Sequence, residues 1–228
     1  MDNQNDLEGL LRSKDALEQL VTRHFKGQKV KKKLPKQLEN EFWHFNIDRT
    51  RSNAIQFFGQ GVITYSIYVL LILPTNYHII RDSEHFAMDF AFSILSLYLV
   101  GMALFLFWVF ARFRVWRAHF YKASCTIMFF TIVSVSLLLL SVSNLVLQNQ
   151  AMLFIAFLYM LGFVLSGIKP FHMLWVGGVA ALTVIISLYA LNIPCDLLIL
   201  ARMFIGSMLL GFSMSVMLNT KERKFFIK

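Results

Sequence analysis

The sequence is poor in charged residues, and it has only four prolines and two cysteines. Asp, Glu, Lys and Arg make up 15% of its 228 residues, whereas soluble domains carry about 25%. Hydrophobic residues reach 57%, and the mean hydropathy is +0.59. This composition argues against a soluble enzyme and against a disordered chain, which needs low hydrophobicity and high net charge. We therefore expect an integral membrane protein.

Residue patterns that carry catalytic chemistry are also missing. The two cysteines, Cys125 and Cys195, cannot build a disulfide framework, and their spacing matches no metal site. The sequence contains no Gly-rich phosphate loop, no paired-carboxylate motif and no Ser/His/Asp arrangement. We therefore expect no catalytic residue, no metal and no cofactor in this chain.

What the sequence does contain is a series of six long apolar runs. A helix needs about 20 residues to cross roughly 30 Å of hydrocarbon. The fourth run is short and fits only if its helix stands upright or the bilayer thins. The pattern predicts an all-α polytopic membrane protein with a six-helix transmembrane bundle. The predicted spans are residues 54–74, 86–111, 123–147, 151–167, 173–192 and 197–218.

Two polar stretches predict where closely spaced spans separate. Gln148, Asn149 and Gln150 separate the third run from the fourth. The segment 192–196, which contains Pro194, separates the fifth from the sixth. Both stretches are short, so the spans pair as antiparallel hairpins.

The distribution of positive charge predicts the orientation of these spans. The net charge is +9, which in a soluble chain would suggest a nucleic-acid partner. Here 20 Lys and Arg fall on the side of both termini, and only Arg81 and Arg202 fall on the other. Cytoplasmic loops carry the excess of Lys and Arg. We therefore expect a membrane protein with both termini in the cytoplasm, and no nucleic-acid partner.

Three segments follow from this topology: a cytoplasmic basic segment 1–53, the six-span domain 54–218, and a basic tail 219–228. Within residues 1–53, leucines recur at helical spacing, which predicts an amphipathic helix. A basic run and an aromatic cluster around Trp43 follow, which indicates a helix resting on anionic headgroups of the lipid bilayer. A partner-binding tail is the alternative. Residues 219–228 form either a simple basic tail or the start of a signalling helix.

Two ionisable residues lie within the predicted spans, where polar groups are costly and tend to mark function. Asp89 and Arg202 both lie near the outer end of their span, so they could pair. Alternatively, Arg202 extends to the headgroups and Asp89 caps its helix. With charged residues just outside the spans, the pair could line an outward-facing pocket for a small-molecule signal. The proposed pocket residues are Asp89, Arg202, Arg81, Glu84, His85 and Asp196.

The sixth span carries small residues four apart, at Ser207, Gly211 and Ser215. Small residues at this spacing let helix backbones approach closely. We expect this face to pack against a neighbouring helix, and we expect the chain to form a homodimer.

Short motifs at both ends of the membrane domain resemble a known family. LPKQLENEFWHFNIDRTR precedes the first span, and the last span reads RMFIGSMLLGFSMSVMLNTKERKFF. These segments resemble the six-span N-terminal sensory region of bacterial GGDEF-type diguanylate cyclases. The matching positions are Leu34, Pro35, Leu38, Glu39, Phe42, Arg202, Arg223 and Phe225.

The resemblance implies a sensory and anchoring role in cyclic di-GMP signalling. It implies no cyclase activity for this chain, because the GG[DE]EF signature that binds GTP and Mg²⁺ is absent. A small six-span transporter remains one alternative. A purely structural membrane protein, or the remnant of a truncated gene, is the other.

Overall fold

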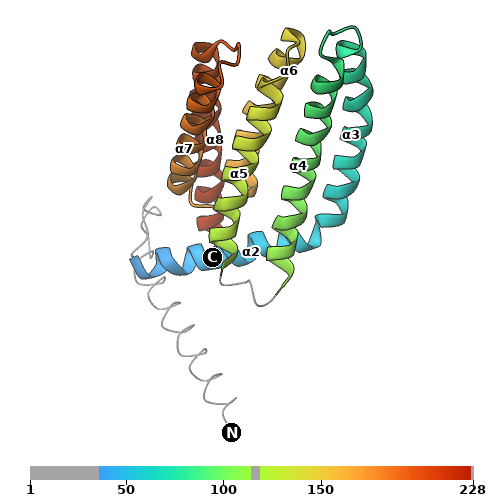
Figure 1. Ribbon diagram of the computed structural model, residues 1–228. Coiled ribbons are helices and arrows are strands. Elements are labelled where there is room, and N and C mark those ends of the chain that lie inside the picture. Colours follow the sequence, from blue (N-terminus) through green and yellow to red (C-terminus); the bar gives the residue numbers. More distant parts are fainter. Residues whose placement is uncertain (1–35, 114–118, 227–228) are drawn as a thin grey trace. The chain divides into compact units, whose positions relative to one another are not determined.

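The computed structural model describes residues 36–113 and 119–226, and all regular structure in these ranges is helical (Figure 1). The prediction of an all-α fold is therefore confirmed. The helices are α2 (Lys36–Gln56), α3 (Phe58–Ile80), α4 (Phe86–Arg112), α5 (Phe120–Leu140), α6 (Leu145–Leu165), α7 (Pro170–Ala190) and α8 (Leu197–Phe226). The leucine-rich part of the predicted amphipathic helix lies outside the described residues.

Six of these helices, α3 to α8, are long and apolar enough to cross a membrane. The shortest have 21 residues, which corresponds to a length of about 31 Å. That length matches the hydrocarbon thickness of about 30 Å. The prediction of six spans is confirmed, and the chain is a multi-pass membrane protein by length and composition.

The predicted break at Gln148–Gln150 is wrong. The turn between the third and fourth spans lies earlier, at residues 141–144, and Gln148 lies inside α6. The Asn144 side chain caps α6, because its Oδ1 accepts hydrogen bonds from the N–H groups of Val146 and Leu147. The fourth span is consequently 21 residues long and needs no thinned bilayer.

The first and last spans also extend beyond the predicted limits. The first was expected to end at residue 74, but α3 continues through Pro74 to Ile80. Proline is tolerated within membrane-spanning helices, where neighbouring groups can satisfy the freed carbonyl. The last was expected to leave the membrane at residue 218, and α8 continues without interruption to Phe226.

The chain divides into two compact units. The larger comprises residues 43–218, and the described parts of the smaller are residues 36–42 and 219–226. Within the larger unit, the connections 81–85, 141–144 and 191–196 lie at one end of the bundle, here called the distal end (Figure 1). The turn 166–169 and the first residues of α5 and α7 lie at the opposite end, here called the basic end.

The main core lies between α5, α6, α7 and α8. Tyr159 of α6 is fully buried, and its ring lies 5.1 Å from that of Phe204 in α8, measured between centroids. The Tyr159 hydroxyl donates a hydrogen bond to the backbone carbonyl of Gly177 in α7, at 3.1 Å. One aromatic side chain therefore joins three spans.

The small-residue face of α8 packs inside this bundle. Ser207, Gly211 and Ser215 are all buried, as expected for a helix-packing face. A Cβ atom added to Gly211 would lie 2.6 Å from Cδ2 of Phe163 in α6. The neighbouring helix that Gly211 approaches therefore belongs to the same chain.

This close approach predicts a cost for any side chain at residue 211. We expect Gly211→Ala to lower stability by about 1–3 kcal/mol, because overpacking forces Phe163 to move. For a chain of this size, each kcal/mol corresponds to about 2–4 °C in unfolding temperature. The measurement is thermal unfolding of the purified protein in detergent. Gly206→Ala on the same helix is the control, because nothing lies within 4 Å of its added Cβ. Equal unfolding temperatures for the two variants would contradict the packing.

Candidate functional site

Asp89 in the first turns of α4 is the most deeply buried acidic residue described, with no exposed surface. Its Oδ1 accepts a hydrogen bond from the backbone N–H of Ser143 at 3.0 Å. Its Oδ2 accepts from the hydroxyls of Ser143 at 2.7 Å and Ser83 at 3.2 Å. The N-terminus of α4 also favours a negative charge at this position. Asp89 therefore joins the α3–α4 connection to the α5–α6 connection.

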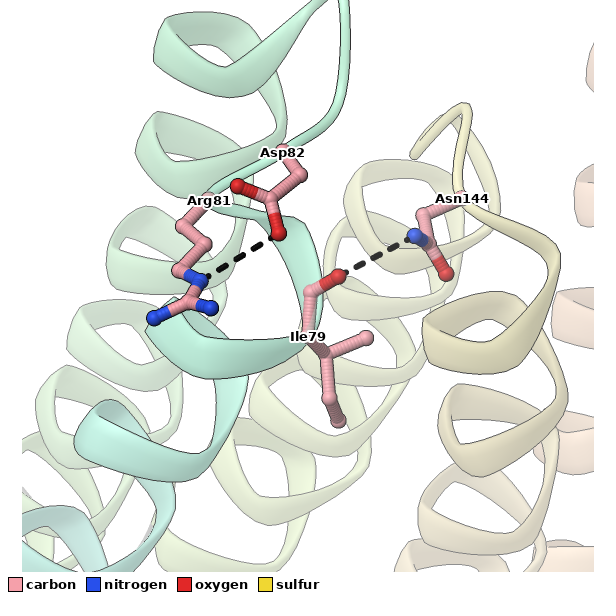
Figure 2. A network of polar contacts seen from close by, with 4 residues as sticks. All are labelled: Ile79, Arg81, Asp82 and Asn144. Carbon is pink, nitrogen blue, oxygen red and sulfur yellow. Dashed lines mark hydrogen bonds and ion pairs between the residues drawn. The ribbon is translucent and has the colours of Figure 1, made fainter.

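Asn144 makes a second link between the same two hairpins. Besides capping α6, its Nδ2 donates a hydrogen bond to the backbone carbonyl of Ile79 at 3.3 Å (Figure 2). Figure 2 shows the exposed ion pair of Arg81 and Asp82 in the turn that follows α3, with 3.2 Å between Nε and Oδ2. A single amide side chain thus caps one helix and holds the C-terminal turn of another.

Gln148 extends these links to the third hairpin. Its side chain is buried in α6, and its Nε2 donates to the carbonyl of Leu140 at 2.8 Å and to that of Pro194 at 3.1 Å. Pro194 belongs to the connection between α7 and α8. All three hairpins are therefore joined at the distal end by a group of side chains that we call the distal polar network: Ser83, Asp89, Ser143, Asn144 and Gln148.

Asp89 and Arg202, which could have paired according to the sequence, do not contact each other in the structure. Arg202 is exposed on α8, and within the described ranges it makes no ion pair with Asp89, whose carboxylate is bound by serines. Asp89 does not cap α4 either, because His85 occupies the N-cap position. In Figure 1, the connections 81–85 and 191–196 lie on opposite sides of the bundle. Similar depth in the membrane therefore does not bring these two charges together.

Of the remaining pocket candidates, one caps a helix and two are exposed. Asp196 caps α8, and its Oδ1 accepts from the N–H groups of Leu198 and Ile199, each at 3.0 Å. Glu84 and His85 are exposed in the connection before α4. A ligand pocket at these residues remains a prediction.

Ser143, Asn144 and Gln148 join the hairpins but were not among the residues expected from the sequence to form the site. An Asn before an apolar run is typical of a helix N-cap, so the sequence could have predicted that a helix begins after Asn144. Gln148 was interpreted as part of a break, although a single amide within an apolar helix is also a candidate for an interhelical hydrogen bond.

A second polar contact lies in the smaller unit, between the start of α2 and the end of α8. Nη2 of Arg223 donates to Oε1 of Glu39, and the guanidinium lies 5.2 Å from the ring centroid of Phe42. Phe42 is fully buried, and it lies three residues after Glu39 on the same helix face. Glu39, Phe42 and Arg223 therefore meet at one point.

Neither cysteine forms a disulfide within the part of the chain that the structure describes. Both Cys125 and Cys195 are free. Burial raises the pKa of the Cys195 thiol, and the nearby Asp196 carboxylate raises it further. This shift disfavours the nucleophilic thiolate. Within residues 36–113 and 119–226, no group of three His, Cys, Asp or Glu could hold a metal ion.

The bonds to Asp89 lead to a prediction about stability. We expect Asp89→Asn to destabilise the protein by about 1–3 kcal/mol, since its amide N–H₂ group replaces an acceptor of buried donors. The measurement is the unfolding temperature in detergent. Asp82→Asn is the matched control, because the Asp82 side chain is 86% exposed, and we expect a change within about 0.5 kcal/mol. If both variants behave alike, Asp89 does not hold the hairpins together.

In comparisons with known proteins, no family model, no curated protein and no solved structure matches this chain. Its function therefore has to be inferred from its own residues. Two features stand out: the distal polar network, which joins three hairpins, and the contact of Arg223 with α2, which holds the end of α8.

Proposed function

We propose that this chain is a membrane-embedded signal-input and anchoring module, of the kind found before the catalytic domain of bacterial diguanylate cyclases. The observation that carries the proposal is α8, an uninterrupted helix of 30 residues. Its length is about 45 Å, which exceeds the hydrocarbon thickness by about 15 Å. A stiff helix that projects from the membrane can pass a movement on to whatever it is joined to.

Polar contacts near each end of α8 support this role. Near its start, Gln148 binds the carbonyl of Pro194, three residues before the helix begins. Near its end, Arg223 binds Glu39 and lies over the ring of Phe42. In the proposed mechanism, a small-molecule signal at the distal polar network alters the Pro194 contact. The helix then shifts, and the Arg223 contact breaks.

The proposed orientation and assembly follow the charge distribution. The distal end faces the outer side of a bacterial inner membrane, and both termini lie in the cytoplasm, because cytoplasmic segments carry the excess of Lys and Arg.

The chain acts as a homodimer in this proposal. Any contact between copies has to use residues other than Ser207, Gly211 and Ser215, which are buried within one chain.

The proposal can be tested by joining a diguanylate cyclase domain in frame after Lys228 and measuring cyclic di-GMP in cells. We expect Arg223→Gln to raise the output about two- to fivefold, because loss of a contact worth up to about 1 kcal/mol shifts a two-state equilibrium by that factor. Lys221→Gln, an exposed change two residues earlier, should leave the output unchanged.

The exchanged pair Glu39→Arg with Arg223→Glu tests whether the change in output comes from losing the contact between residues 39 and 223 or only from losing the charge of Arg223. We expect it to return the output toward the wild-type level, since the two charges can still meet. If Arg223→Gln leaves the output of an equally abundant membrane fusion unchanged, the end of α8 does not transmit a signal.

The relation to cyclases has a more direct test in the coding DNA after the Lys228 codon. We expect the reading frame to continue into a segment that contains a GG[DE]EF motif. An immediate stop codon would contradict the cyclase relation, whereas the effect of Arg223 in the fusion would still report on signal transmission.

A further inference from the structure

A group of cationic and aromatic side chains lies at the basic end of the larger unit. Lys169 is the N-cap residue of α7, and its backbone N–H donates a hydrogen bond to the Tyr121 hydroxyl at 3.3 Å. The same hydroxyl lies 2.6 Å from Nδ1 of His172. The start of α5 and the start of α7 are therefore linked through one phenol oxygen.

This link is compatible with the tautomer of His172 that carries its proton on Nε2. A backbone N–H can only donate, so the Tyr121 oxygen is an acceptor toward Lys169. The phenol's own proton is then available for Nδ1 of His172, and a ring whose Nδ1 accepts carries its proton on Nε2. His172 is exposed. It therefore offers a hydrogen-bond donor, held in place by Tyr121, to whatever surrounds the basic end.

The charged group of Lys169 is also held in place. Its Nζ lies 5.5 Å from the ring centroid of Trp43, a residue of α2 that is only 7% exposed. An ammonium over an aromatic face is attracted by the ring, which restricts a long and otherwise flexible side chain. No carboxylate pairs with Lys169 or His172 within the described ranges.

The position of this group matches the depth of lipid headgroups. Tyr121 is the second residue of α5, and His172 is the third of α7, so both lie at the end of a membrane-spanning helix. The N-terminus of α7 adds partial positive charge at the same place. Tryptophan and tyrosine prefer this boundary.

We propose that Trp43, Tyr121, Lys169 and His172 form a binding site for the phosphate group of an anionic phospholipid. The Lys169 ammonium supplies the charge, and Nε2–H of His172 supplies a directed hydrogen bond. Tyr121 and Trp43 act by holding these two donors. The site is independent of the proposed signalling role, because it concerns only which lipid binds the protein.

The test measures lipid binding to the purified full chain in detergent by native mass spectrometry. Phosphatidylglycerol is titrated against phosphatidylcholine. We expect wild-type protein to bind phosphatidylglycerol more tightly. Either Lys169→Gln or His172→Phe should weaken that binding about tenfold, the effect of losing one charge-assisted hydrogen bond.

Two matched variants separate this site from the general positive charge of the basic end. Lys122→Gln removes an exposed charge next to Tyr121 and should change binding less than about twofold, as expected for a screened surface charge. His172→Gln keeps an N–H donor and should bind more tightly than His172→Phe. It also serves as the folded comparison if the phenylalanine variant is unstable.

Several results would overturn the proposal. Equal affinity for the two lipids would mean that the site does not select an anionic phospholipid, which contradicts the proposal. Equal losses in Lys122→Gln and Lys169→Gln would point to unspecific charge. Soluble glycerol phosphate is the further arm of the test. If it displaces the lipid at comparable concentration, the site takes free phosphate groups and is not a lipid site.

Discussion

Every polar group that a helix carries into an apolar layer has to find its partner within the protein, because hydrocarbon offers none. Some hydroxyl groups find a partner on their own helix: Ser124 donates to the carbonyl of Phe120 at 2.8 Å, four residues earlier. Asp89 and Gln148 instead bond to residues of other connections, at Ser143 and Pro194. The need to satisfy a few polar side chains thus determines how the three hairpins are joined at the distal end.

The number of spans could be predicted from the sequence, whereas the turn at residues 141–144 could not. Hydropathy shows where a chain is apolar enough to cross a membrane, but the run from residue 123 to 147 has no charged residue and is predominantly apolar on both sides of the turn. The turn contains a single amide, Asn144, beside two weakly polar serines, so it interrupts the hydropathy profile less than three consecutive amides do. The more polar Gln148–Gln150 segment, by contrast, is accommodated within α6, where Gln148 finds two backbone carbonyls.

The lateral order of the helices could not be predicted either. In a soluble helix, the buried face is the apolar one, but a helix surrounded by lipid is apolar on its outer face as well. Asp89 and Arg202 both lie in the first turns of their helices, but their sequence positions gave no information about which helices are neighbours. The small-residue spacing at Gly211 predicted a close helix contact. It could not tell whether the partner was Phe163 of the same chain or a second copy, and the structure shows the former.

The hydrogen bond and the ion pair that flank α8 are each weak, which matters for the proposed signalling role. The hydrogen bond from Gln148 to Pro194 contributes about 1 kcal/mol. The ion pair of Arg223 and Glu39, whose side chains are 20% and 28% exposed, contributes up to about 1 kcal/mol after solvent screening. A ligand that alters either contact can change which position of α8 is more populated, since populations respond to differential binding.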